Sequence, residues 1–168
     1  LLTDSGWVDM SDNGIQLIVV DGPNGYILTF ATDVFAKITD PDFPGASTVT
    51  FLNQRFIVSE PDTGRFFWSA LLDGASWDAL DFATAEASPD NIVSVFAEAG
   101  QLYLFGETTT EIWGDSGAAD QAFVKIGGGA VEWGLAAKQS VVKYMDSMAF
   151  LRKNRLGQVQ VCVMAGSV

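Results

Sequence analysis

The chain contains no histidine and only one cysteine. Without histidine, serine and cysteine triads of the usual kind, most zinc sites and the commonest general base are excluded. Cys162 has no partner for a disulfide within the chain, so packing must hold the fold together. It lies in the alternating segment 158–163, where a small buried apolar side chain is expected rather than a nucleophile. We therefore predict no enzyme activity, no cofactor and no bound metal.

Basic residues are also scarce. Nine Lys and Arg stand against 21 Asp and Glu, which gives a formal net charge of −12 over 168 residues. Phosphate backbones and anionic membrane surfaces repel such a chain, so we expect no direct binding of nucleic acid and no membrane contact. No apolar run approaches the length of about 18 residues that a membrane-spanning helix needs. The start at Leu1, with neither an initiator methionine nor a signal pattern, indicates a fragment of a longer protein.

Apolar and aromatic residues are abundant, with 48% hydrophobic content, 12 Phe, five Trp and three Tyr. Together with many Val and Ile, they favour strands over helices and are enough for a sizeable core. The acid–aromatic pair Glu111 and Trp113 is interpreted as strand alternation, with the acid outward and the indole inward. Only residues 134–138 could form a helix, of one turn at best.

A strand–turn–strand segment recurs four times, and this repeat predicts the fold. Residues 16–28 align with 55–67 without a gap, which places Gly25 on Gly64 at an offset of 39. The pattern continues at Gln101, which aligns with Gln54 at an offset of 47. It returns in the last unit, where Gly157 aligns with Gly64. Such spacings are typical of four-stranded blades around an axis, with these three glycines in equivalent turns.

We therefore predict one all-β, β-propeller-type domain over residues 1–168, with about three and a half blades of four antiparallel strands. The blades are expected at about 6–40, 47–83, 91–127 and 139–168. In the clearest unit, the strands are expected near 48–53, 55–60, 65–71 and 77–82. The last unit lacks an outer strand, and an open sheet edge can pair with another chain. The chain should either self-associate or complete its last blade with residues 6–10.

The hairpin at 59–68 resembles the Asp box of sialidase-type propellers, which is a structural turn. Asp62, Gly64 and Phe67 fit that pattern, whereas Ser59 stands one residue too early. Sialidase-like catalysis also needs an arginine cluster, and the chain has only four arginines, two of them close together around one turn. A carbohydrate-binding or sialidase-like propeller, working through aromatic residues at blade rims, is the alternative function.

Five short motifs follow one another in the second half of the chain. They are residues 109–113 (TTEIW), 123–128 (FVKIGG), 130–143 (AVEWGLAAKQSVVK), 146–151 (DSMAFL) and 154–158 (NRLGQ). In this order they resemble the packaged-DNA stabilisation, or tail-hub, proteins of P22-like short-tailed bacteriophages. Lys153 and Arg155 depart from the pattern, because acidic residues are expected near that turn.

The resemblance implies a structural protein of the virion tail, assembled in the host cytoplasm. Such a protein caps the portal, retains packaged DNA and docks other tail proteins, with several copies in a ring. No active site is implied. For the contacts with the portal and other tail proteins, our candidates are Trp133 and its neighbour Glu132, because aromatic anchors dominate interface energetics. The alternative interpretation of Trp133, with at least equal weight, is a side chain wedged between neighbouring blades.

Overall fold

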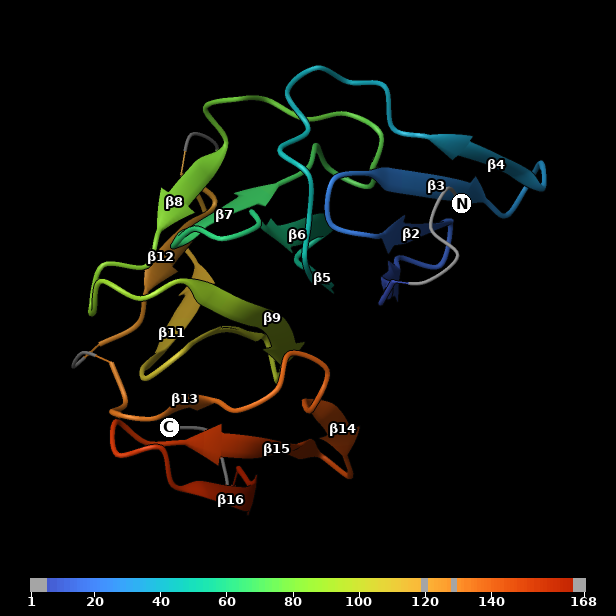
Figure 1. The fold of residues 1–168 in the computed structure, drawn as a ribbon. Helices are drawn as coiled ribbons and strands as arrows, with labels where there is room; N and C mark the ends of the chain where they lie inside the picture. Colours follow the sequence, from blue (N-terminus) through green and yellow to red (C-terminus); the bar gives the residue numbers. More distant parts are fainter. Residues whose placement is uncertain (1–5, 119–120, 128–129, 165–168) are drawn as a thin grey trace.

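A computed structural model describes residues 6–118, 121–127 and 130–164, and within these ranges the secondary structure consists of strands without any helix. The strands form four sheets that follow one another along the chain (Figure 1). The first sheet contains β1 (Asp9–Asp12), β2 (Gln16–Val20), β3 (Gly25–Thr29) and β4 (Val34–Lys37). The second contains β5 (Val49–Leu52), β6 (Arg55–Ser59), β7 (Arg65–Trp68) and β8 (Phe82–Thr84).

The third sheet contains β9 (Ile92–Glu98), β10 (Gln101–Gly106), β11 (Thr110–Asp115) and β12 (Phe123–Lys125). The fourth contains β13 (Gly134–Leu135), β14 (Val142–Tyr144), β15 (Ser147–Lys153) and β16 (Val159–Val163). All strand pairs are antiparallel, and in the first three sheets each strand pairs with the next one along the chain. This arrangement confirms the predicted all-β class with four-stranded antiparallel blades.

The first strand of each blade lies on the inner side of the arc (Figure 1). Polar contacts join these strands from blade to blade. The backbone N–H of Val49 on β5 donates to Asp9 Oδ2 on β1 at 2.9 Å. The backbone N–H groups of Val95 and Ala97 on β9 donate to the hydroxyls of Thr48 and Thr50, each at 3.0 Å. The inner strands therefore fix the positions of the first three blades relative to one another.

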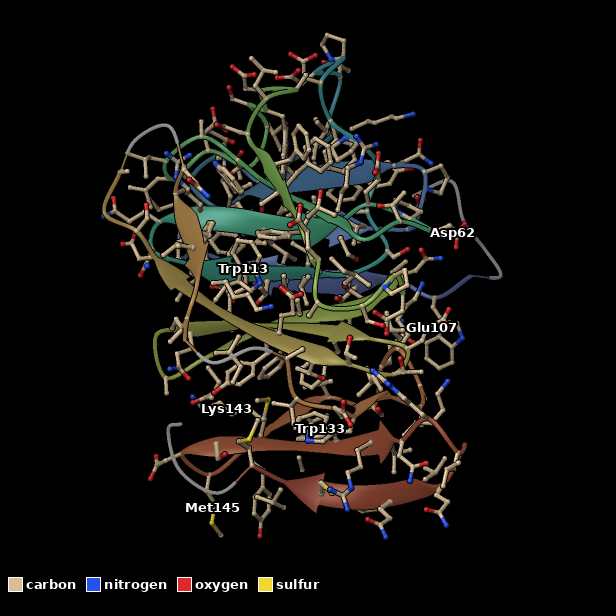
Figure 2. All side chains as sticks on the ribbon, turned by 90° about the vertical axis from the view of Figure 1, so that its left-hand side faces the viewer. Asp62, Glu107, Trp113, Trp133, Lys143 and Met145 are labelled. Atoms are coloured by element: carbon tan, nitrogen blue, oxygen red, sulfur yellow. The ribbon has the colours of Figure 1, made fainter. Side chains whose placement is uncertain are left out.

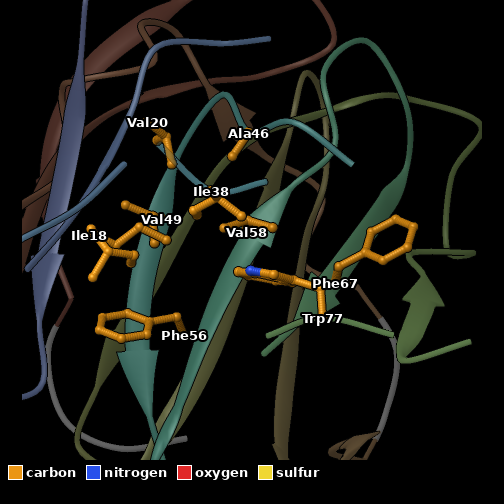
Figure 3. Packing of buried hydrophobic residues seen from close by; sticks show 10 residues of the cluster. Ile18, Val20, Ile38, Ala46, Val49, Phe56, Val58, Phe67 and Trp77 are labelled. Carbon is orange, nitrogen blue, oxygen red and sulfur yellow. The ribbon is translucent and has the colours of Figure 1, made fainter. Parts of the chain in front are cut away.

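Three apolar clusters fill the spaces between successive blades. The first, between blades one and two, contains Ile18 and Val20 from β2 together with Phe56 and Val58 from β6 (Figure 3). The second lies between blades two and three, and the third between blades three and four. Among the described residues, none of the three clusters joins blade one to blade four. The blades thus form an open arc, held together at three interfaces.

The fourth blade is narrower than the others. β14 pairs with residues 147–149 of β15 and β13 with residues 152–153, while β16 pairs with residues 149–153. Because β16 overlaps both pairings, β13 and β14 must share the opposite edge of β15. The blade is therefore three strands wide, with its inner strand divided into two pieces. This agrees with the prediction of about three and a half blades.

Two predictions about segments were wrong. Residues 9–12 form the inner strand of blade one and pair with β2, so they do not complete the last blade. Gly134 and Leu135, the start of the possible helical turn, instead form β13. A third segment differs in extent: the last strand of blade two was expected at 77–82, and β8 covers residues 82–84. The indole of Trp77 is buried in the first cluster, which holds this segment as a loop.

The register of the repeat was also wrong by one residue in blades three and four. The two-residue turn at Asn53-Gln54 corresponds to Ala99-Gly100 and to Met145-Asp146, which places the equivalent turns 46 residues apart. The alignment at an offset of 47 was therefore one residue too long. A slip of one residue moves every side chain of a strand to the other face. Phe56 and Ile57, on adjacent positions of β6, are both fully buried, so apolar alternation could not fix the register.

Candidate functional site

Trp133, one of the two residues predicted for docking, packs between the third and fourth blades (Figure 2). Its indole stacks on Phe150 of β15 with ring centroids 4.9 Å apart, and it lies 6.2 Å from the ring of Phe105 on β10. The backbone carbonyl of Trp133 also accepts a hydrogen bond from Thr110 Oγ1 at 2.8 Å. Through these contacts, Trp133 attaches blade four to blade three.

Glu132, the other predicted residue, is exposed to solvent. One of its carboxylate oxygens lies 3.9 Å from Arg155 Nη2, in the turn before β16. Both side chains are largely exposed, and exposed ion pairs contribute little to stability. Glu132 is therefore available on the surface beside Trp133, which is partly buried.

The hairpin that resembles an Asp box uses its polar groups internally. Glu60 accepts hydrogen bonds from Arg65 Nε at 2.6 Å and Nη2 at 2.7 Å, and from Thr63 Oγ1 at 2.9 Å. Arg55, on the same sheet, donates to the carbonyl of Ser69 at 2.6 Å. These side chains hold a hairpin and a sheet edge, so the structure does not bring them together as a reactive cluster.

Of the three predicted turn glycines, Gly64 and Gly157 lie between two strands of a hairpin, whereas Gly25 is the first residue of β3, and each position has a different local environment. At Gly25, a Cβ atom would come within 2.7 Å of Ile38 and Phe43 side-chain atoms. At Gly64, the nearest atom to a Cβ lies at 3.5 Å, and the positive φ of that turn belongs to Asp62 (59°). Gly157 has a φ of +78°, the left-handed region that favours glycine.

Glu111 is buried, which corrects its interpretation as an outward-facing acid. Its carboxylate accepts hydrogen bonds from Trp113 Nε1 at 2.8 Å and from the backbone N–H of Ala87 at 2.5 Å. Lys125 Nζ lies 3.3 Å away. Residues i and i+2 of a strand share a face, so Glu111 and Trp113 had to lie together. The carboxylate connects β11 to the segment between blades two and three and has a structural role.

A cavity of about 260 Å³ lies beside the inner strands. Its lining comes from β1, β5, β9 and the segment before β14, and includes Asp9, Thr50, Ser94 and Lys138. Burial raises the pKa of Asp9, and hydrogen bonds from the backbone N–H groups of Val49 and Met10 act in the opposite direction. Residues of all four blades therefore line this polar cavity.

The described part of the chain contains no cluster of three or more acidic or cysteine side chains suited to a metal ion. It also holds no helix of the length and apolarity required to cross a membrane.

Comparisons with solved structures show a shared fold at very low identity. An extracellular domain of a hybrid two-component system from B. thetaiotaomicron matches with a TM-score of 0.56 and 11% identity, over 98% of this chain and 23% of that one. Hsv2 of Kluyveromyces lactis matches with a TM-score of 0.52 and 13% identity, over 98% and 48%. BamB from Moraxella catarrhalis matches with a TM-score of 0.51 and 10% identity, over 93% and 52%. This chain therefore spans about half or less of the length of these structures.

A search of the curated proteins finds no match. A family model described as bacteriophage P22 Gp10, beta-propeller, matches residues 2–168. The matched range contains all four blades, including the first two, for which the sequence motifs gave no specific resemblance.

Proposed function

Because this chain belongs to the bacteriophage P22 Gp10 beta-propeller family, we propose that it forms part of a tail protein that closes the portal after DNA packaging. In this role it retains the genome and offers a surface to later tail proteins. The observation that carries the proposal is the family match over residues 2–168. The chain is a phage structural protein, and the portal contact, the retention of DNA and the docking role are the proposed parts.

The absence of free reactive chemistry in the described residues supports a structural role. Glu60, Arg65 and Arg55 are engaged in hairpin and sheet contacts, and Glu111 is buried with three partners. No histidine is available anywhere in the sequence. The blades thus offer shape and contact surface, which are what a plug or an adaptor requires.

The strongly acidic charge is compatible with a protein that retains DNA without binding it tightly. A net charge of −12 repels phosphates, so this part of the protein would not bind the DNA end tightly. A plug can hold DNA by closing the exit, and a repulsive surface leaves the genome free to depart once the exit opens. We propose portal and tail proteins as partners, with several copies arranged in a ring.

Of the two residues predicted for docking, we propose separate roles. Glu132 is exposed and can contact a tail partner directly, whereas Trp133 positions the local surface by attaching blade four. The pocket beside Arg55 does not support the carbohydrate alternative. In the cavity of about 400 Å³ beside Arg55, the only aromatic side chain among the lining residues is Phe123, which is fully buried.

The decisive experiment deletes the gene for the whole parent protein in the phage. We expect particles that package DNA normally and then lose it, measured as empty capsids by electron microscopy and as released DNA that nuclease can digest. Wild-type protein supplied from a plasmid should restore filled particles. Particles that keep their genome but fail to bind cells would contradict the proposal and indicate receptor or sugar binding.

A second measurement tests the docking residue. Glu132→Lys, supplied from the plasmid, should reduce the number of filled particles because it reverses an exposed charge at the proposed contact. Glu107→Lys is the matched control, since Glu107 is also exposed and lies in the turn between β10 and β11. Equal rescue by both variants would exclude Glu132 from the contact.

A further inference from the structure

A cavity of about 400 Å³ lies beside Arg55, between blades two and three. Its lining comes from the β5–β6 turn and Leu71 of blade two and from Asp115 and Phe123 of blade three. We call it the Leu71 cavity. Blades two and three each pack against another blade on both sides, so further blades added to the arc would not cover this cavity.

The Leu71 cavity lies at one end of the arc. The β5–β6 turn in its lining corresponds to the β14–β15 turn, which carries Met145. Met145 lies at the end of the blades opposite to Asp62 and Glu107 (Figure 2). Glu132 pairs with Arg155 in the β15–β16 turn and therefore belongs to the end with Asp62 and Glu107.

Two leucines at this cavity present apolar side chains to solvent. Leu71, in the lining, and its neighbour Leu72 are 59% and 40% exposed. The backbone N–H of Leu72 donates to the carbonyl of Gln54 at 2.6 Å, and the carbonyl of Leu72 accepts from Asn13 Nδ2 at 3.3 Å. Leu72 has a φ of +57°, in the left-handed region that leucine rarely adopts. Such conformations persist only where the surrounding structure fixes them, and they concentrate at binding sites.

The charges around the Leu71 cavity are unbalanced. Arg55 Nη1 donates to the carbonyl of Ser69 at 2.6 Å and lies 3.9 Å from Asp81 Oδ2, so this cation is already engaged. Asp115, in the lining, and Asp73, next to Leu72, form no ion pair within the part of the chain that the structure describes. This surface therefore combines apolar side chains with negative charge that a partner can neutralise.

We propose that the Leu71 cavity docks a basic, apolar segment of another protein. An apolar side chain of that segment enters the cavity and contacts Leu71 and Leu72, while Lys or Arg residues beside it contact Asp73 and Asp115. Side chains that fill pockets dominate interface energetics, and complementary charges around them select the partner. This contact is separate from the one proposed for Glu132, and it does not depend on the retention of DNA.

Complementary charge argues against other occupants. A second copy of this chain would bring the same carboxylates and a net charge of −12, so like charges would meet at the contact. Nucleic acid and anionic membrane surfaces are repelled for the same reason. The occupant is therefore a different protein with a local excess of Lys and Arg.

Photo-cross-linking in assembled particles identifies the occupant. The parent protein, supplied from a plasmid to the deletion phage, carries p-benzoylphenylalanine in place of Leu71. After irradiation of purified particles, we expect a cross-link to a peptide of another virion protein that contains apolar residues next to Lys or Arg. The same group in place of Val124 is the control and should not react with that peptide, because strand residues alternate and Phe123 lines the cavity.

Neutralising the two carboxylates tests the role of charge. Asp73→Asn together with Asp115→Asn keeps oxygens that accept from the backbone N–H groups of Ala75 and Gly117. This pair should reduce the yield of the Leu71 cross-link, per copy of the parent protein, by roughly tenfold. Asp62→Asn together with Glu107→Gln is the matched control, because it removes two exposed charges at the opposite end (Figure 2).

Circular dichroism of the purified chains confirms that each pair of substitutions keeps its strands. Particles without a cross-link at the Leu71 position, or with a cross-link to the parent protein itself or to an acidic peptide, would overturn the proposal. Equal yields from the two neutralised pairs would also contradict it. Because the readout is a cross-linked peptide, it succeeds or fails separately from the loss of DNA that tests portal closure.

Discussion

The second and fourth blades contain the same hairpin but bury it to different depths. In β6, Phe56, Ile57 and Val58 are all fully buried, because a neighbouring blade lies on each side. In β15, Met148 and Phe150 are buried, while Ala149 and Leu151 between and after them are only partly buried. The strands are similarly apolar, so the difference comes from their neighbours. Burial in this fold depends on the position of a blade in the arc.

The largest expected effect contrasts one substitution in each of these blades. Ile57→Ala should lower the free energy of unfolding by about 2–5 kcal/mol, because it leaves a cavity in a packed interface. Leu151→Ala, on the partly exposed side of β15, should cost clearly less. Urea unfolding of both variants at one protein concentration provides the measurement. Equal losses would show that the face of blade four that points away from blade three is as well packed as the interior.

The attachment of blade four gives the second prediction. A Cβ atom on Gly134 would collide with the backbone of Gly106 and Glu107, so β13 depends on a close approach to blade three. Gly134→Ala should therefore cost about 1–3 kcal/mol, the usual range for overpacking.

Gly64→Ala is the control for this variant. Its Cβ would find no atom closer than 3.5 Å and its φ is not positive, so stability should change little. Thermal unfolding followed by circular dichroism compares the two variants, and similar melting temperatures would contradict the close approach at Gly134.

Sequence reasoning located most strands because each hairpin is marked by its turn. The strands expected near 48–53 and 55–60 are β5 (Val49–Leu52) and β6 (Arg55–Ser59), and their observed ends lie within one residue of the expected ones. Sequence reasoning misaligned the repeat by one residue in blades three and four, because the reference strand β6 is apolar on both faces and alternation then carries no information about register. It also failed at β13, whose two residues are held by β15 and blade three and carry no strand pattern of their own.

The site was less accessible to sequence reasoning than the fold. Trp133 was identified as an anchor, but the sequence could not distinguish an exposed anchor from a side chain held between blades by Phe105 and Phe150.

The connection between blades two and three gives a smaller expected effect. Glu111→Gln keeps an oxygen that can accept from Trp113 but removes the charge opposite Lys125. The loss of charge-assisted bonds should cost about 1 kcal/mol. Glu107→Gln is the control, since Glu107 is exposed. Urea unfolding measures both, and an unchanged midpoint for Glu111→Gln would mean that the buried carboxylate adds no stability to this connection.

The smallest expected effect concerns the contact between blades one and two at Asp9, and it appears only as a dependence on pH. Burial raises the pKa of Asp9 above its ordinary value of 3.8. Between 3.8 and the raised value, the folded protein binds more protons at this site than the unfolded chain. The contribution of Asp9 to stability is therefore fully present below the unfolded pKa and declines as the pH rises through the folded pKa.

Asp9→Asn removes this titration and keeps an oxygen that can accept from the N–H of Val49. From pH 4 upward, wild-type stability should fall relative to that of the variant and then run parallel to it once Asp9 is fully ionised. Asp12→Asn, an exposed position on the same strand, is the control and should not produce this relative decline. Melting temperatures across this pH range provide the measurement. A wild-type curve that rises relative to Asp9→Asn would show that the hydrogen bonds from Val49 and Met10 outweigh burial, and that the charged carboxylate stabilises the contact between the blades.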